Sequence, residues 1–189
     1  MKVVAIQGSP RRGGNTEIVL DAVIEGLTQK TDAEVSVIRA AAKRISGCVE
    51  DFACQMVADA PGCSIQDDMS EVYEALLGAD LVLLASPVFC WSVSAQLKAI
   101  LDRLYACFKF SASPPTCLLA GKSLALVMTA GGGPNDGANL IEAMYDQLVQ
   151  LGQGVDRGRF LGALMKEPGQ TRRDTGLLER ARQFGASLV

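Results

Sequence analysis

Three segments rich in glycine, serine, proline and asparagine hold the residues best suited to chemistry in this chain. They are residues 8–16, 86–94 and 129–137, and each follows a short apolar run. Such runs predict buried strands, and open α/β sheets bind ligands at the carboxyl ends of their strands, where the strand order reverses. We therefore expect the three segments to meet and form one binding site.

The first segment, residues 8–16, reads GSPRRGGNT and links a predicted strand to a predicted helix. Its glycine pair, Gly13-Gly14, allows the backbone to turn its amides inward, which suits a phosphate dianion at a helix N-terminus. A helix dipole contributes ~0.3–1 kcal/mol, whereas each hydrogen bond to a charged oxygen contributes about 1.5–3 kcal/mol. Several hydrogen-bond donors would therefore contribute more to phosphate affinity than the helix dipole does. The alternative is an ordinary polar turn with a basic tip.

Composition excludes several classes of function. The chain has no histidine, which removes Ser-His-Asp and Cys-His catalysis and imidazole metal ligation. Its net charge of −3 disfavours a nucleic-acid partner, because such a partner requires a basic face. The chain shows no apolar run near the roughly 18 residues of a membrane span and no secretory pattern at the N-terminus. We expect a cytoplasmic protein with no membrane partner.

Periodicity predicts alternating strands and helices. Apolar runs predict five strands, at residues 2–7, 34–39, 80–85, 123–129 and 155–164. Helical periods predict five helices, at residues 15–29, 67–77, 94–108, 138–151 and 175–188. This alternation is typical of a parallel sheet covered by helices on both faces. The 189 residues suit a single domain, residues 1–189, with an irregular cysteine-bearing insertion at about residues 40–66.

Several sequence blocks together resemble a known family. They are residues 8–16, Asp67-Asp-Met69, Ala79-Asp80, Ser86-Pro-Val-Phe89 and residues 94–103. In this order they resemble the NAD(P)H-dependent FMN reductases, and more narrowly the branch related to iron–sulfur flavoproteins. The resemblance implies a flavodoxin-like three-layer α/β sandwich with a five-stranded parallel sheet of order 2-1-3-4-5.

The resemblance also implies where FMN would bind. The expected cofactor-binding residues are Ser9, Arg11, Asn15 and Thr16 for the phosphate, Pro87, Val88 and Phe89 for the isoalloxazine ring, and Thr129, Gly131, Gly132 and Gly133 near the ring edge. Trp91 would cover the ring or close a neighbouring subunit's pocket; equally, it would anchor a core or an interface. No residue is assigned as a catalytic acid or base.

The implied activity is transfer of a hydride from NAD(P)H through flavin N5 to a small acceptor, such as a quinone or a flavin. Two alternatives remain open: an FMN electron-transfer protein reduced by a partner protein, and a flavin-binding sensor. A homodimer or homotetramer is expected from the resemblance.

The cysteines depart from the branch pattern. The iron–sulfur branch has four closely spaced cysteines, near C-x2-C-x2-C-x4–7-C, whereas this segment has Cys48, Cys54 and Cys63 at wider spacing. Four thiolates normally hold such a cluster, so we expect no iron–sulfur cluster and no metal. A relic loop that packs at the flavin edge or at a subunit contact, or a redox-active Cys54–Cys63 pair, would explain these thiols instead.

Overall fold

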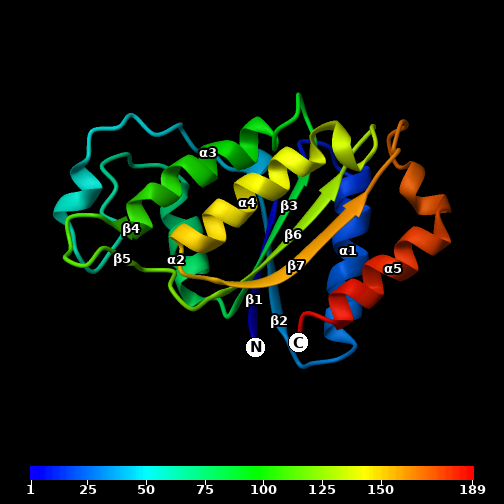
Figure 1. Ribbon diagram of the computed structural model, residues 1–189, viewed down its shortest axis with the longest axis horizontal. Helices are drawn as coiled ribbons and strands as arrows, with labels where there is room; N and C mark the ends of the chain where they lie inside the picture. Colours follow the sequence, from blue (N-terminus) through cyan, green and yellow to red (C-terminus); the bar gives the residue numbers. More distant parts are fainter.

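A five-stranded parallel sheet forms the centre of the computed structural model, which describes residues 1–189 (Figure 1). The strands run in the order β2-β1-β3-β6-β7. Their bounds are Lys2–Gln7 (β1), Glu34–Arg39 (β2), Leu81–Pro87 (β3), Ser123–Thr129 (β6) and Val155–Gly162 (β7). The chain moves outward from β1 to β2 and then returns to β3 on the other side of β1, so the strand order reverses between β1 and β3.

Helices cover both faces of this sheet (Figure 1). One face packs against α1 (Asn15–Thr28) and α5 (Thr175–Ala186). The other face packs against α2 (Met69–Gly78), α3 (Ala95–Arg103) and α4 (Asn139–Leu151). The predicted flavodoxin-like three-layer architecture and strand order are confirmed.

Strand burial explains why the sequence shows apolar runs. Val4 and Ile6 of β1 belong to the core beneath α2, α3 and α4, whereas Val3 and Ala5 face α1 and α5. Every residue of β3 is buried. Parallel strands covered on both faces read as continuous hydrophobic runs, because neither side of the strand meets water.

Helices α1 and α5 approach each other with backbone almost touching backbone. A Cβ placed on Gly26 would lie 1.9 Å from the Arg182 carbonyl oxygen, and one placed on Gly185 would lie 1.9 Å from the Val23 carbonyl oxygen. Only glycine permits this approach. The contact fixes the position of α1, whose first turn follows the 8–16 loop.

The chain between α3 and β6 differs from the prediction of one helix over residues 94–108. Helix α3 ends at Arg103 and is followed by a 3₁₀ turn, Leu104–Cys107. Strand β4 (Phe108–Lys109) then pairs antiparallel with β5 (Thr116–Cys117), a hairpin that the sequence did not predict. Strands of two residues are too short to show a period, and the 3₁₀ turn continues the helical spacing of apolar residues.

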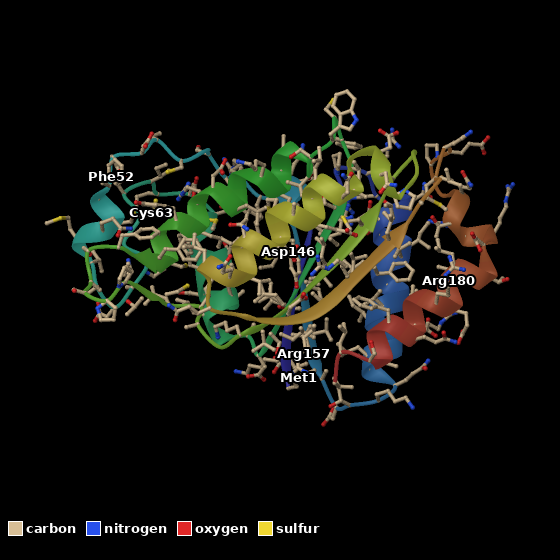
Figure 2. All side chains as sticks on the ribbon, viewed as in Figure 1. Met1, Phe52, Cys63, Asp146, Arg157 and Arg180 are labelled. Atoms are coloured by element: carbon tan, nitrogen blue, oxygen red, sulfur yellow. The ribbon has the colours of Figure 1, made fainter.

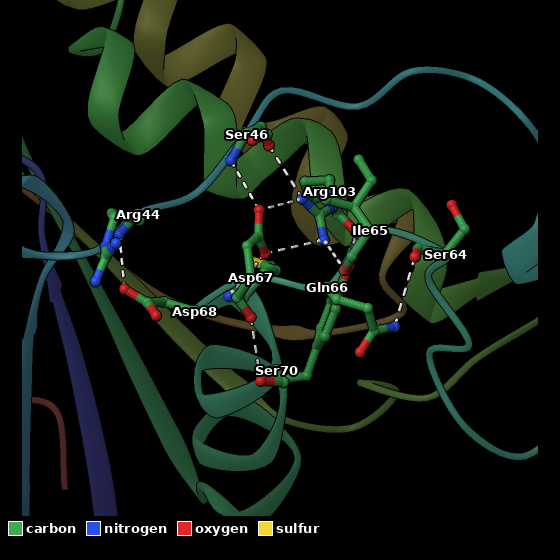
Figure 3. A network of polar contacts seen from close by, with 11 residues as sticks. Arg44, Ser46, Ser64, Ile65, Gln66, Asp67, Asp68, Ser70 and Arg103 are labelled. Atoms are coloured by element: carbon green, nitrogen blue, oxygen red, sulfur yellow. Dashed lines mark hydrogen bonds and ion pairs between the residues drawn. The ribbon is translucent and has the colours of Figure 1, made fainter.

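The insertion at residues 40–66 is irregular apart from two short 3₁₀ turns, Ala40–Ala42 and Ala53–Met56. Arg103 connects it to α3: the guanidinium contacts Asp67 and the backbone carbonyls of Ser46 and Ile65 (Figure 3). None of the protein's helices combines the length and apolar character that crossing a bilayer requires.

Candidate functional site

The three Gly- and Ser-rich loops meet in one pocket at the carboxyl edge of the sheet, beside the point where strand order reverses. Nine of the twelve residues expected from the sequence line this pocket: Ser9, Arg11, Asn15, Thr16, Pro87, Val88, Phe89, Thr129 and Gly131. Gly14, Ala130 and Met165 line it as well. Met165 follows β7, and the sequence signal that could have identified it is that this loop leaves the same edge of the sheet.

The first loop presents backbone donors to the pocket. No carbonyl or side chain of the protein accepts the amide protons of Gly14, Asn15 or Thr16, which open α1. Gly13 adopts a left-handed conformation with φ 62°, and its amide donates to the Glu17 carboxylate. Free amides at a helix N-terminus form an anion-binding site, since their dipoles point toward the ligand.

A buried hydroxyl pair joins the first loop to the third. The Oγ1 atoms of Thr16 and Thr129 lie 2.7 Å apart, and these residues are 2% and 4% exposed. Thr129 ends β6 and Thr16 lies in the first turn of α1. The hydrogen bond therefore sets the distance between two walls of the pocket.

The side chain of Asn15 binds the segment after β7. Its Nδ2 donates to the carbonyl oxygen of Glu167 at 2.8 Å, and its Oδ1 accepts from the Thr171 hydroxyl at 2.8 Å. Both ends of the amide are thus engaged within the protein. The side chain of Asn15 positions the wall that includes Met165, and the backbone amide of Asn15 stays available to a ligand.

The second loop contains a tight two-residue turn. Phe89 and Ser92 exchange backbone hydrogen bonds of 2.9 and 3.0 Å, and the central residues Cys90 and Trp91 have φ values of 45° and 60°. Such turns favour Asn-Gly, because both central residues are left-handed. Each non-glycine residue held there costs about 1–3 kcal/mol, so the surrounding contacts impose this turn.

Amides of the second loop divide into two groups. Val88 donates its amide proton to the Thr129 carbonyl at 2.8 Å, and Phe89 donates to Ser92. The amide protons of Cys90 and Trp91 have no acceptor within the protein. The Val93 amide has no acceptor either, but Val93 is only 5% exposed, so the free donors of this loop on exposed residues are those at the left-handed turn.

Trp91, Gly132 and Gly133 lie outside the lining of the pocket. Trp91 is 63% exposed, and its Nε1 donates to the Asp136 carboxylate at 3.1 Å. Gly132 faces the same carboxylate, because a Cβ there would lie 2.2 Å from Asp136 Oδ2. These residues connect the second and third loops at the rim.

A serine pair, which the sequence analysis did not identify, holds the first and second loops together. Ser94 caps α3 by accepting from the Leu97 amide at 3.2 Å, and its hydroxyl donates to the Gly8 carbonyl at 2.6 Å. The Ser94 amide in turn donates to the Ser86 hydroxyl at 3.0 Å. A serine directly before a helical period is a recognisable N-cap signal, but its contact with Gly8 depends on the fold.

The comparison with known sequences then decides the family. A profile of the NADPH-dependent FMN reductase family matches residues 1–160. The chain belongs to this family. An iron–sulfur flavoprotein of Archaeoglobus fulgidus is 36% identical to this protein, and the match covers 100% of this chain and 79% of the relative. An iron–sulfur flavoprotein of Methanosarcina thermophila is 31% identical over 86% of this chain and 81% of the relative. The predicted family and branch are confirmed.

A solved structure agrees with the fold of this FMN reductase family member. The NAD(P)H:quinone oxidoreductase from Methanothermobacter marburgensis has a TM-score of 0.76 and 21% identity, with 100% of this chain and 99% of that chain covered. At this identity the likeness shows the shared architecture.

The thiols of this reductase-family chain do not have the arrangement of an iron–sulfur ligand set. Cys48, Cys54 and Cys63 lie on the wall of one cavity, but no three Cys, His, Asp or Glu side chains come together as metal ligands. Cys107 and Cys117 are buried around the β4–β5 hairpin. A four-thiolate cluster does not fit this arrangement.

Proposed function

We propose that the pocket binds FMN and that the protein is an NAD(P)H-dependent reductase of a small acceptor, such as a quinone or another flavin. The observation that carries the proposal is the set of free amides at Gly14, Asn15 and Thr16, next to an apolar wall at the strand reversal. A phosphate ester attached to a flat ring matches this combination of donors and apolar surface. The family description supports the same cofactor.

The phosphate end of the cofactor would bind the first loop. The three free amides would donate to it together with the hydroxyls of Ser9 and Thr16, and the guanidinium of Arg11 would neutralise its charge. Asn15 would act mainly through its backbone amide, because its side chain is engaged with Glu167 and Thr171.

The ring end would bind between the second and third loops. Pro87, Val88 and Phe89 would supply the apolar wall, and Thr129 and Gly131 would border the ring edge. The free amides of Cys90 and Trp91 would donate to ring heteroatoms, with Gly132, Gly133 and Trp91 at the rim. When bound, FMN supplies the site that accepts a hydride and passes electrons on.

The protein groups would orient the reactants and would not transfer protons. No Asp, Glu, Lys, Cys or Tyr lines the pocket, and the chain has no histidine. Protons for the acceptor would therefore come from solvent. This assignment of roles requires no catalytic acid or base in the protein.

The proposal has a direct test. The recombinant protein should have flavin absorption or bind FMN at micromolar concentration, and anaerobic stopped-flow mixing with NADH or NADPH should bleach the flavin within seconds. A colourless protein that does not bind added FMN would refute the proposal. Slow bleaching with both donors would favour an electron carrier or a flavin-binding sensor.

We also propose that the protein forms a homodimer or homotetramer through the pocket rim. Phe89, Trp91 and Leu164 are 42%, 63% and 58% exposed there, and large apolar side chains gathered at a site often mark an interface. Light scattering coupled to size exclusion tests this. A monomer at micromolar concentration contradicts it.

A further inference from the structure

A carboxylate at the start of α1 opposes the ligand proposed for the first loop. Glu17 is the third residue of α1, and the first turn of this helix carries the free amides of Asn15 and Thr16. One oxygen of Glu17 accepts the Gly13 amide proton, so the side chain closes the loop. A negative charge in the first turn stabilises a helix. It also occupies the positive helix end that would attract a phosphate dianion.

Arg39 neutralises this carboxylate. Its Nη1 pairs with the other oxygen of Glu17, and its Nη2 donates to the Arg11 carbonyl at 3.4 Å. Arg39 ends the edge strand β2 and lies opposite Gln7, which ends β1, so it reaches the loop from the neighbouring strand. The side chains of Arg39 and Glu17 are 22% and 24% exposed, and salt therefore screens their charges incompletely.

Two other cations at the loop have no carboxylate partner. Arg172 lies against the loop, since a Cβ placed on Gly13 would be 2.7 Å from Arg172 Nη2. Neither Arg172 nor Arg11 forms an ion pair within the protein. Both guanidinium groups therefore remain available to a phosphate, whereas the charge of Arg39 is engaged with Glu17.

Arg39 has no direct access to the pocket. Neither Arg39 nor Glu17 lines it, so Arg39 would affect a ligand only through the carboxylate and the loop that it contacts. Asp21, one turn later on α1, belongs to the same group of charges: partial burial and then the charge of Glu17 raise its pKa, whereas Arg39 lowers it. Without Arg39, two carboxylates near the start of α1 would lack a counter-ion.

We propose that Arg39 is a positioning residue of the phosphate site, which neutralises Glu17 and so allows a helix N-terminus closed by a carboxylate to accept the phosphate of FMN. This inference rests on the proposed function, because it concerns the same cofactor. Arg39 should matter for a flavin that has a phosphate. It should not matter for riboflavin, which has the same ring and no phosphate.

Arg39→Gln tests this selectivity, because it removes the charge and keeps a polar side chain. In flavin titrations FMN should bind about tenfold more weakly than to wild type, whereas riboflavin binding should change by less than about twofold. Equal losses for both flavins would mean that Arg39 only supports the fold of the loop, and the proposal would be wrong. A wild type that bound FMN no more tightly than riboflavin would refute the phosphate site itself.

Glu17→Gln separates the effect of charge from that of structure. Glutamine keeps an oxygen that can accept the Gly13 amide proton, but it has no charge. If charge decides, the two partners of one ion pair should act in opposite directions, and Glu17→Gln should bind FMN at least as tightly as wild type. A structural ion pair would be weakened alike from either side. Similar losses of FMN binding in Arg39→Gln and Glu17→Gln would therefore overturn the proposal.

The double variant Arg39→Gln/Glu17→Gln completes the cycle. It removes both charges and keeps the acceptor for Gly13, so FMN binding should return to within about threefold of wild type although the ion pair is absent. Arg39→Lys retains the positive charge and should also stay within about threefold. A double variant that binds FMN as weakly as Arg39→Gln would overturn the proposal.

Arg182→Gln is the matched control. Arg182 belongs to α5, where Figure 2 shows Arg180, and its Nε pairs with Glu25 of α1 at 2.8 Å. Glu25 follows Glu17 by eight positions, or ~12 Å at about 1.5 Å per residue, so an unpaired carboxylate there should leave FMN binding unchanged. Circular dichroism checks that every variant is folded. Equal losses of FMN binding in Arg182→Gln and Arg39→Gln would indicate a general effect of net charge and would contradict the role of Arg39.

Discussion

The hydroxyl oxygens of Thr16 and Thr129 lie 2.7 Å apart in the buried floor of the pocket, although 113 positions separate them in the sequence. Because each hydroxyl is the other's only side-chain partner, removing one leaves the other buried and unpaired. An unpaired buried hydroxyl costs about 1–3 kcal/mol. This pair therefore couples folding stability to the shape of the proposed FMN site.

Thr16→Val should lower the free energy of unfolding by about 1–3 kcal/mol and weaken FMN binding about tenfold, as measured by urea denaturation and flavin titration. Thr28→Val is the matched control, because the Thr28 hydroxyl bonds only to carbonyls of its own exposed helix end. It should change stability by less than about 0.5 kcal/mol. Equal effects of the two variants would contradict the coupling.

Asn15→Asp should release the segment that contains Glu167 and Thr171. The substituted carboxylate cannot donate to the Glu167 carbonyl, and it places a negative charge next to the proposed phosphate site. We expect faster amide hydrogen exchange in this segment and FMN binding at least tenfold weaker. Asn139→Asp, at the exposed start of α4, is the control and should change neither. Unchanged exchange in Asn15→Asp would show that the Asn15 amide does not hold the segment.

Cys90→Gly should stabilise the protein, because glycine adopts the left-handed conformation of the turn without steric strain. Relief of strain gives about 1–3 kcal/mol, and the added freedom of the unfolded chain offsets about 0.5–1 kcal/mol of it. Cys48→Gly is the matched control: Cys48 is also exposed but has no left-handed backbone, so this change should be neutral or destabilising. Thermal denaturation distinguishes the two, and a lower Tm for Cys90→Gly would contradict the strain.

The sheet could be predicted from the sequence because burial of each strand leaves an apolar run that a short segment of sequence shows by itself. Strands such as β3 are buried on both faces and alternate with helical periods, which predicted the parallel sheet, whereas the order of its strands was implied by the family resemblance. The path of the insertion could not be predicted, because Arg103 fixes it through contacts 36 and 57 positions away. The exposed position of Trp91 depends on a left-handed turn for which neither Cys90 nor Trp91 is a typical residue.

Asp67→Asn should remove a contribution to the free energy of unfolding that depends on the ionised Asp67 carboxylate and is therefore lost in acid. Burial alone would raise the pKa of Asp67, but hydrogen bonds from the Ser46 amide and from Arg103 outweigh it and hold the pKa below its usual 3.8. A lowered carboxyl pKa means that the stabilisation is complete well above pH 3.8 and is lost as the pH falls through the folded-state value. The free energy of unfolding of the wild type should therefore exceed that of Asp67→Asn at neutral pH, and the difference should shrink as the pH falls.

At neutral pH this variant leaves Arg103 buried without its counter-ion, which should cost about 3–5 kcal/mol. Asp68→Asn is the adjacent control. Asp68 accepts only from the Arg44 amide at an exposed site, so we expect a loss below about 1 kcal/mol. Urea denaturation from pH 3 to 7 measures both variants, and a pH-independent gap between wild type and Asp67→Asn would contradict the assignment.

Gly26→Ala should force α1 and α5 apart. The new Cβ would lie 1.9 Å from the Arg182 carbonyl oxygen and 2.6 Å from its carbonyl carbon, and backbone atoms in a packed helix cannot move aside as a flexible side chain can. Overpacking of this kind costs about 1–3 kcal/mol or more. Because α1 begins at the first loop of the pocket, FMN binding should weaken as well.

Gly78→Ala provides the matched control. Gly78 is the last residue of α2, and a Cβ there would meet no atom within 4 Å. Alanine favours helix over glycine by about 1 kcal/mol, so this variant should be neutral or slightly more stable and should bind FMN normally. Urea denaturation and flavin titration compare the two. If Gly26→Ala were as stable as Gly78→Ala, the close approach of α1 and α5 would be wrong, and with it the placement of the helix that opens the phosphate loop.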